Sequence, residues 1–372
     1  MYQILTQCVK ELLQFWRYRL TVALAFLLPL ITLLIYGFAI RLETKNIPII
    51  VQDFDKSPLS RAYIDTFVAS NQYNLIIPKL KNGNEPRRFV QDALDKGIAK
   101  VGMIIPPDFT KQIKDGKNSN VQFIVDGTDV VNSKVVKNGA VAITQYFMIS
   151  NGLKIPEIKI NRKLRIWFNP GRKESLFIVP GVFTVALGIF PAILASIAMV
   201  REKEEGNIIQ VYASGISAFQ FIAGKSLAYL IIAIGEAILT MGIGGIIFGM
   251  SIVGDPFSFL VGTVLFLSSS VLFGSMIGAL VPDQRSAIQF TGMVQALSVM
   301  LFSGFIYPLS NIPFPISLMA YIVPASYYMI LIRDAFVRGS GLSATWYILP
   351  FLAGICILEF FIAWRLMRKM QL

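Results

Sequence analysis

The 372-residue sequence contains no histidine. Histidine is the side chain that titrates near neutral pH, so its absence excludes histidine acid–base catalysis, serine–histidine triads and histidine-ligated metals together. Cysteine is almost as rare, because only Cys8 and Cys356 occur and neither lies in the polar part of the chain. A disulfide framework is therefore excluded there. We expect neither a metal site nor a catalytic centre in this chain.

Charge is scarce as well. Only 15% of the residues are charged, against roughly 25% in ordinary soluble domains, and 55% are hydrophobic. Several uncharged windows reach the roughly 20 residues that a helix needs to cross a bilayer. A soluble fold cannot bury that much apolar surface, so the sequence predicts an α-helical integral membrane protein.

The charges that exist gather in one block. Between Arg41 and Glu174 the chain carries 22 basic and 13 acidic residues, a net charge of +9 out of +12 for the whole chain. The block has no stripe of interleaved aromatic and basic residues and no zinc-ligand spacing. We therefore expect no binding to nucleic acid.

A complete phosphate-binding loop is also missing. The segment "AGKS" at 223–226 resembles the end of such a loop, but the motif needs a glycine five positions before the Gly-Lys pair, where the chain has Phe219. The motif also follows a strand, whereas this segment opens an apolar run. We expect no ATP hydrolysis by this chain and no cofactor bound to it.

The first 40 residues predict two helices of different kinds. Residues 1–19 have helical periodicity that separates Cys8 and Leu12 from Gln7 and Glu11, which predicts an amphipathic helix in the membrane interface that contacts lipids, with its basic residues toward the headgroups. A cytoplasmic stub is the plainer alternative. Residues 20–40 form the first predicted span, and the absence of a cleavage site after this long apolar run favours a retained helix over a signal peptide.

Residues 41–175 predict a small α/β domain. Strand patterns alternate with helix patterns along this region, as in compact α/β units. The strands are expected in 47–53, 73–80, 100–106 and 120–127, and the helices in 57–70, 84–97 and 132–150.

The region 176–372 predicts five more spans and one irregular segment. The spans are expected at about 177–200, 220–249, 257–281, 286–306 and 346–366. Segment 307–340 is too apolar for an exposed loop and too rich in proline for a crossing helix, which predicts a re-entrant hairpin. Arg333 and Asp334 are expected to anchor this hairpin at the interface, or to form a local ion pair.

Six spans in all put both termini on one side of the membrane. Lysine and arginine gather near both chain ends and in the loops after spans two and four, which marks this side as cytoplasmic. The α/β domain, inserted between spans one and two, is therefore expected outside the cytoplasm. The predicted location is the plasma membrane, in a bacterium the inner membrane.

Two carboxylates fall inside predicted spans. Glu236 lies near the middle of its span, where a charge is costly, so a functional role and a neutral carboxyl bonded to a neighbouring helix both remain open. Glu359 lies near the cytoplasmic end of the last span and is expected to reach Arg365. The glycine pairs at 245–249 and 274–278 predict close helix packing.

The segment "REKEEG" at 201–206 places five charges between two apolar runs. We call it the charged segment. The following "NIIQVYAS" is predicted to form a short amphipathic helix along the membrane surface, ended by Gly215, so that the coupling region as a whole covers 201–218. The residues alone leave two hypotheses open, a plain solvated loop and a docking element for a soluble partner.

Seven stretches along the chain carry a resemblance to a known family. They are "VQDFDKSPLSR" (51–61), "VGMIIPPDF" (101–109), "VQFIVDGTD" (121–129), "WFNP" (167–170), "VPG" (179–181), "MVREKEEGN" (199–207) and "GKSLAY" (224–229). In order and spacing they resemble the permease subunits of type-two ABC exporters with a large extracytoplasmic domain. The resemblance implies two paired permeases, identical or different, and two separate ATPase subunits that bind ATP and Mg²⁺. It also implies an extracytoplasmic chamber that sometimes contacts a periplasmic adaptor protein.

The resemblance also implies a role for the charged segment. In this family the ATPase grips such a segment together with the following short helix and the N-terminal interfacial helix. The corresponding residues of this chain are Arg201, Glu202, Lys203, Glu204 and Gly206.

The chain departs from the family pattern just after these residues. Asn207 and Ile209 stand where threonine and glutamate are usual, and Gly215 and Ala228 stand where prolines are usual. The lost carboxylate suggests an ATPase with its own matching surface, or a heterodimer in which this chain is the weaker-coupling half.

The predicted function is that of a permease subunit that exports a hydrophobic or amphiphilic substrate from the cytoplasm or the inner leaflet, powered by a separate ATPase. Two alternatives remain open. The chain would otherwise be a membrane sensor or scaffold that binds a ligand through its extracytoplasmic domain, or an ion-coupled transporter that uses Glu236, although no inverted repeat is evident.

Overall fold

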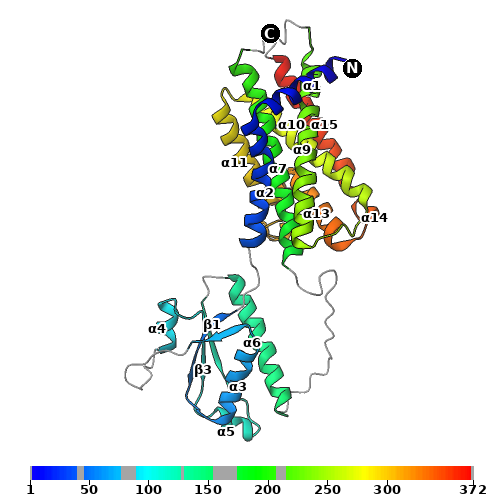
Figure 1. The fold of residues 1–372 in the computed structure, drawn as a ribbon. Coiled ribbons are helices and arrows are strands. Elements are labelled where there is room, and N and C mark those ends of the chain that lie inside the picture. Colours follow the sequence, from blue (N-terminus) through cyan, green and yellow to red (C-terminus); the bar gives the residue numbers. More distant parts are fainter. Residues whose placement is uncertain are drawn as a thin grey trace. The chain divides into compact units, whose positions relative to one another are not determined.

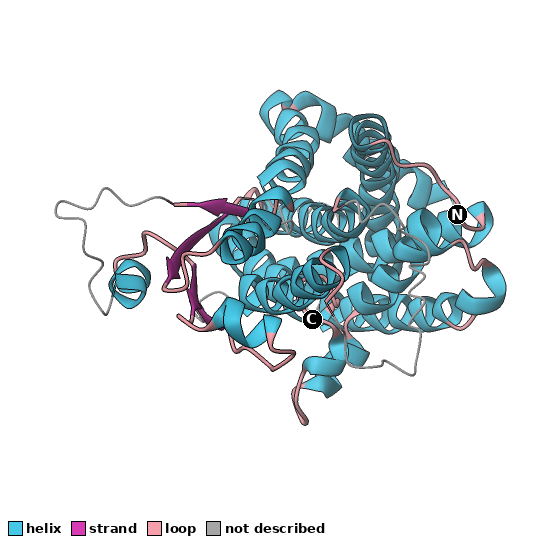
Figure 2. Ribbon diagram, turned by 90° about the horizontal axis from the view of Figure 1, so that it is seen from below, coloured by secondary structure: helices cyan, strands magenta, loops and turns pink. Residues whose placement is uncertain are grey.

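The computed structural model describes residues 2–39, 46–76, 89–126, 130–153, 174–206 and 215–369. The chain divides into a helical unit, residues 1–40 and 165–372, and an α/β unit, residues 41–164. Within the described residues every strand belongs to the α/β unit, and the rest of the fold is helix and connecting loop (Figure 2).

The α/β unit is built on a four-stranded sheet with the order β2-β1-β3-β4. Strand β1 (Ile47–Asp53) runs parallel to β2 (Tyr73–Leu75) and β3 (Val101–Ile105), and β4 (Gln122–Val125) is antiparallel to β3. The helices are α3 (Pro58–Ala69), α4 (Phe89–Asp95), α5 (Phe109–Lys114) and α6 (Val130–Ser150). These elements lie in the predicted segments, except for the short α5, which was not predicted.

Helices cover both faces of this sheet. Successive side chains of a strand point to opposite faces. Ile49 of β1 therefore packs with Phe67 of α3 and Phe147 of α6, whereas Ile50 packs on the other face with Val90 of α4. Figure 1 shows α4 on one side of the sheet and α3 and α6 on the other. Two-sided cover of this kind is usual for a largely parallel sheet.

The described part of the helical unit is built of helices of 4 to 31 residues. They are α1 (Tyr2–Arg17), α2 (Arg19–Ala39), α7 (Ser175–Glu204), α9 (Ala218–Phe248), α10 (Pro256–Leu280), α11 (Gln284–Phe302), α12 (Ser317–Ile322), α13 (Pro324–Arg333), α14 (Leu342–Thr345) and α15 (Ile348–Lys369). Five described helices, α2, α7, α9, α10 and α15, are long and apolar enough to cross a membrane. Helix α1 and the C-terminal end of α15 lie at the same end of the unit (Figure 1).

Helix α11 forms where the fifth span was predicted, but it is not one of those five helices. Polar side chains, among them Arg285, Gln289 and Gln295, make it less apolar than its neighbours. Because five of its described helices are long and apolar enough to cross a membrane, the chain is a multi-pass membrane protein. The count of six spans stays a prediction.

Helix α7 is the centre of the helical unit, with most of its side chains buried among α2, α9, α10 and α11. Two glycines of α10 allow the closest approach. A Cβ atom on Gly274 would overlap the carbonyl oxygen of Ala192, and one on Gly278 would lie 2.6 Å from that of Ser196. The packing role predicted for 274–278 is therefore confirmed. The pair at 245–249 has no such role, because Gly249 ends α9 in a left-handed conformation with φ of 62°.

The segment 307–340 is broken into short pieces, as its prolines predict. A 3₁₀ turn η1 (Leu309–Asn311) is followed by α12, α13 and a π-helical turn η2 (Asp334–Arg338). No single helix of this segment is long enough to cross a membrane in the described structure. Its re-entrant position stays a prediction.

Helix α1 buries part of the half that was predicted to be polar. Gln7, Glu11 and Phe15 are buried against the helical unit. A second stripe is apolar and exposed, and it consists of Tyr2, Leu5, Val9, Leu13 and Trp16. The prediction that placed Gln7 and Glu11 on a solvent-facing half was wrong, because both side chains have polar partners within the unit.

Candidate functional site

The charged segment is the last turn of α7 and not a separate loop. Arg201 to Glu204 are helical, and the Glu205 backbone N–H still donates to the Arg201 carbonyl oxygen at 2.9 Å. Gly206 then leaves the helix with φ of 69°. Basic side chains suit this position, because the C-terminal end of a helix carries partial negative charge. The short helix predicted over 207–214 lies outside the described residues.

The basic side chains of this turn contact other helix ends. The Arg201 guanidinium lies 4.3 Å from the centre of the Tyr18 ring, which stands between α1 and α2. A cation over an aromatic face is weakly stabilising. The Lys203 ammonium caps α10 by donating to the carbonyl oxygens of Gly278 (2.8 Å), Ala279 and Val281 (3.2 Å).

Glu204 contacts the start of α11. Its Oε1 atom accepts a hydrogen bond from the Gln284 backbone N–H at 2.9 Å, next to the capping Asp283. Hydrogen bonds from Ser286 hold the pKa of Asp283 below its ordinary value. Two carboxylates therefore face the positive end of α11, where negative charge is favourable. The last turn of α7 joins the end of α10 to the start of α11.

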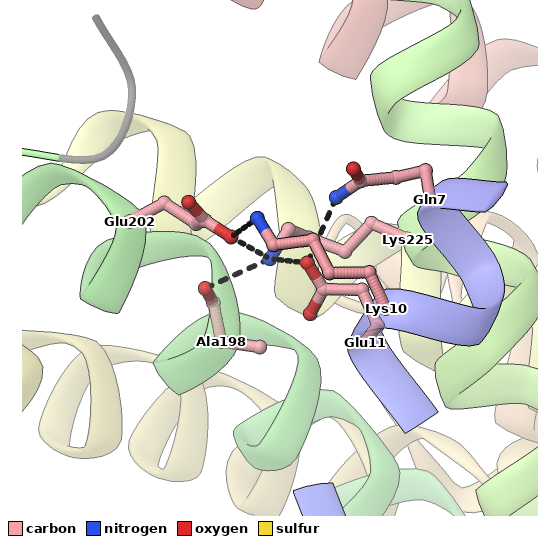
Figure 3. Close-up of polar contacts among 6 residues, drawn as sticks. All are labelled: Gln7, Lys10, Glu11, Ala198, Glu202 and Lys225. Carbon is pink, nitrogen blue, oxygen red and sulfur yellow. Dashed lines mark hydrogen bonds and ion pairs between the residues drawn. The ribbon is translucent and has the colours of Figure 1, made fainter. Parts of the chain in front are cut away.

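Glu202 points the other way, into a buried charge cluster with α1 and α9 (Figure 3). The Lys225 Nζ atom of α9 lies 2.7 Å from Glu11 Oε1 and 3.7 Å from Glu202 Oε1, and it donates to the Ala198 carbonyl oxygen at 3.1 Å. Lys10 Nζ donates to the same Glu202 oxygen at 3.1 Å. We define the buried charge cluster as Lys10, Glu11, Glu202 and Lys225.

The cluster balances two positive and two negative charges, of which Glu11, Glu202 and Lys225 are buried and Lys10 is exposed. The Lys225 side chain is 2% exposed, and Gln7 adds a hydrogen bond from Nε2 to Glu11 Oε1 at 2.9 Å. Ion pairs at such depth are costly to break, because removal of one partner leaves an uncompensated buried charge at about 3–5 kcal/mol. The cluster therefore fixes the relative positions of three helices.

Local sequence explains how α1 and α9 come this close. Ser217 and Gln220 form a capping box that starts α9, which places Lys225 two turns inside the helix. The residue before it is Gly224, where a Cβ atom would lie 2.8 Å from the Ile4 carbonyl oxygen of α1. A larger residue would force the two backbones apart.

The sequence reasoning missed Lys225 and Glu11 as partners. It treated "AGKS" only as a failed phosphate-binding loop. A signal was present, since Glu11 is the only acidic residue in the first 40 positions and Lys225 the only basic residue of α9. Two such isolated charges of opposite sign are typical of a buried pair.

The two intramembrane carboxylates differ in their surroundings. Glu236 is 0% exposed, and neither of its carboxylate oxygens has a hydrogen-bond partner among the described residues. Glu359 accepts a hydrogen bond from Ser269 Oγ at 2.6 Å, so the expected contact with Arg365 was wrong. Glu359 thus links α15 to α10, in the way that neutral or charged polar groups connect membrane helices.

Arg333 and Asp334 do not pair with each other. The Arg333 guanidinium lies 4.7 Å from the centre of the Phe177 ring at the start of α7. The Asp334 carboxylate accepts hydrogen bonds from the backbone N–H groups of Ser340 (3.0 Å) and Gly341 (3.1 Å). Arg333 therefore fixes segment 307–340 to α7, and Asp334 binds the loop that follows η2.

Comparison with known proteins gives the family. The model of the family described as "ABC-2 family transporter protein" matches residues 16–365. The chain belongs to the ABC-2 transporter family. Its relatives include the probable multidrug ABC transporter permeases YbhS and YbhR of Escherichia coli K12, which are 26% and 25% identical to it. The alignments cover 90% of this chain and 88% of YbhS, and 91% of this chain and 90% of YbhR.

A third relative, the inner membrane transport permease YhhJ of Escherichia coli K12, is 22% identical over 85% of this chain and 86% of its own length. These relatives span both units of the ABC-2 chain. The match therefore concerns the whole architecture and not the membrane helices alone.

The helical unit of this ABC-2 chain also contains an open apolar cavity of about 450 Å³ between α9, α10 and η2. Met241, Gly242, Phe259 and Phe336 are among its lining residues, and no charged side chain of the described chain lines it. The lining suits a hydrophobic molecule or chain.

Proposed function

We propose that this permease subunit of an ABC exporter moves a hydrophobic or amphiphilic substrate out of the cytoplasm or the inner leaflet, with energy from a separate ATPase subunit. The family match over residues 16–365 carries the proposal. The names of YbhS and YbhR, together with the apolar cavity in the helical unit, support a substrate of this kind. Family membership favours this reading over a sensor and over an ion-coupled transporter.

The contact with the ATPase is proposed at the exposed edge of the charged segment. Glu204 and Gly206 are exposed, Arg201 and Lys203 are half-buried, and Glu202 is buried. The exposed edge faces the ATPase, while the three preceding side chains hold the turn in place. Binding of ATP then pushes this turn laterally and rocks α2, α7 and α11, which opens the far end of the helical unit for release.

The remaining partners follow from the same proposal. ATP and Mg²⁺ belong to the ATPase, and this chain contributes no catalytic residue. A second permease, identical or different, completes the pathway, and α11 offers it an exposed apolar stripe of Phe290, Met293, Leu297 and Leu301. Membrane lipids surround the helical unit and the outer stripe of α1. A periplasmic adaptor protein is a further partner of the α/β unit.

The orientation belongs to the proposal as well. Both chain ends are cytoplasmic and the α/β unit is extracytoplasmic, in the bacterial inner membrane. Segment 307–340 then lies at the release end, where Arg333 holds it against α7 and Asp334 binds the loop that follows η2.

Co-expression with an ABC ATPase subunit tests the proposal. We expect a tagged permease to co-purify with that ATPase, and ATP hydrolysis in proteoliposomes to rise with at least one member of a panel of amphiphilic compounds. Glu204→Lys is expected to lower this stimulation while the permease remains monodisperse. Asp115→Lys, an exposed charge reversal in the α/β unit, is the matched control. A permease that binds no ATPase would refute the proposal.

A further inference from the structure

The buried charge cluster joins three helices that are separate in sequence. Lys10 and Glu11 belong to α1, Glu202 to the last turn of α7 and Lys225 to α9. Lys225 is the common member, because it contacts both carboxylates and also the backbone carbonyl of Ala198 in α7. Figure 3 shows its ammonium between the two carboxylates.

We propose that Lys225 is a positioning residue that makes α1, the end of α7 and the start of α9 move as one body when the ATPase acts on the charged segment. This inference rests on the proposed function. Glu202 lies in the same helical turn as the exposed Glu204, so a displacement of that turn is delivered directly to Lys225 and from there to Glu11.

Stability alone does not explain the cluster. Well-packed apolar side chains of similar volume are often as stabilising as a buried ion pair, or more so. The three helices already have apolar contacts nearby, since Phe15 of α1 packs edge-on against Tyr229 of α9 and Cys8 is buried in the same core. The best-attested use of buried charges is to fix a single register. A fixed register is what the transmission of a lateral push requires.

Lys225 pairs with Glu11 of α1 and with Glu202 of α7 at the same time. Two carboxylates converge on one ammonium, so any slide of α1 or α7 past α9 leaves a buried carboxylate without its full partner set. Lys10, which is 46% exposed, joins α1 to Glu202 of α7 at 3.1 Å but contacts no carboxylate for α9. Loss of the Lys225 charge therefore frees α9 from both α1 and α7, which loss of the Lys10 charge does not do.

Cys8 supplies a native probe of this inference. It is buried on α1 beside Glu11, and Cys356→Ala leaves it as the single cysteine of the chain. The permease–ATPase complex is labelled with N-ethylmaleimide in its nucleotide-free and ATP-trapped states. We expect Cys8 to be protected in both states, since α1 moves together with α7 and α9.

The decisive variant is the triple substitution Glu11→Gln, Glu202→Gln and Lys225→Met, which removes the three buried charges and leaves only Lys10, which is 46% exposed, without its ionic partner. We expect it to keep Cys8 protected without nucleotide and to raise labelling about tenfold in the ATP-trapped state. Lys225→Arg is expected to retain protection, and Arg17→Met on the exposed side of α1 serves as the control. A merely structural role would raise labelling equally in both states.

Two results would overturn the inference. One is a triple variant that stays protected in the ATP-trapped state. The other is a wild-type complex that exposes Cys8 when ATP is trapped, and this measurement stands even where the triple variant fails to fold. If no ATPase binds the wild-type chain, the proposed function fails and this inference falls with it, whereas a bound ATPase with an exposed Cys8 removes only the inference.

Discussion

Helix α7 is held in two different ways on its two sides. Against α10 it is held by close backbone packing, because Gly274 and Gly278 bring that helix onto the carbonyl groups of Ala192 and Ser196. Against α1 and α9 its end is held by charges, through Glu202 and Lys225. The first contact runs along the middle of the helix and the second lies at its last turn.

The two contacts have different physical properties. Close packing is short-ranged and lost with a small separation, so α7 and α10 are expected to stay together in every state. Charge attraction is longer-ranged and depends on the identity of the partner. The last turn of α7 also binds the end of α10 through Lys203, so α7 and α10 are expected to move together while the charges at the end of α7 carry α1 and α9 with them.

The largest effect is expected from Lys225→Met, which removes the charge that joins the end of α7 to α9. The change leaves Glu11 and Glu202 facing each other in a buried site, with only the partly exposed Lys10 nearby. We expect a loss of about 3–5 kcal/mol in stability. Thermal unfolding of the detergent-solubilised protein measures it as a clear fall in Tm and in the yield of monodisperse protein.

The matched comparison is the neutral triple variant. It removes both carboxylate charges together with the ammonium. We therefore expect its Tm to lie well above that of Lys225→Met and close to that of the wild type. Equal Tm values for the wild type and Lys225→Met would show that the cluster does not hold the three helices.

A second substitution tests the close contact between α7 and α10. Gly274→Ala places a methyl group against the Ala192 carbonyl group, which is backbone and cannot turn away. Overpacking of this kind costs about 1–3 kcal/mol. Gly354→Ala on the exposed face of α15 is the control, because a Cβ atom there meets nothing within 4 Å. Equal Tm values for the two variants would contradict the close contact between α7 and α10.

The positions of the helices were largely predictable, because membrane spans depend on local composition. The segments predicted at 220–249 and 257–281 became α9 and α10 with shifts of one or two residues at their ends. Helix α7 was predicted to stop at residue 200, but it continues to Glu204. The charges after residue 200 were predicted to form a solvated loop or a docking element. The structure instead gives Glu202, Lys203 and Glu204 partners at other helices.

The partners themselves were not predictable in the same way. Which face of α1 is buried depends on its packing against α9, and no periodicity of residues 1–19 contains that information. Glu11 was therefore assigned to the solvent side, although it pairs with Lys225 far along the chain. A charge in an apolar helix can be recognised from sequence, and its partner becomes known only from the packing of the helices.

The smallest effect is expected from Glu236→Gln, in the middle of α9. This carboxyl is fully buried and has no hydrogen-bond partner in the described structure, unlike Glu202 at the end of α7. A carboxyl in such a place is expected to hold its proton, because a charge buried without a partner is very costly. An amide of the same shape should then change the stability by less than about 1 kcal/mol.

Thr240→Val, one turn further on and also without a partner among the described residues, is the control. A fall in Tm as large as that of Gly274→Ala would mean that Glu236 is ionised and paired in the assembled transporter, and the contrast between a charged helix end and a neutral helix middle would not hold.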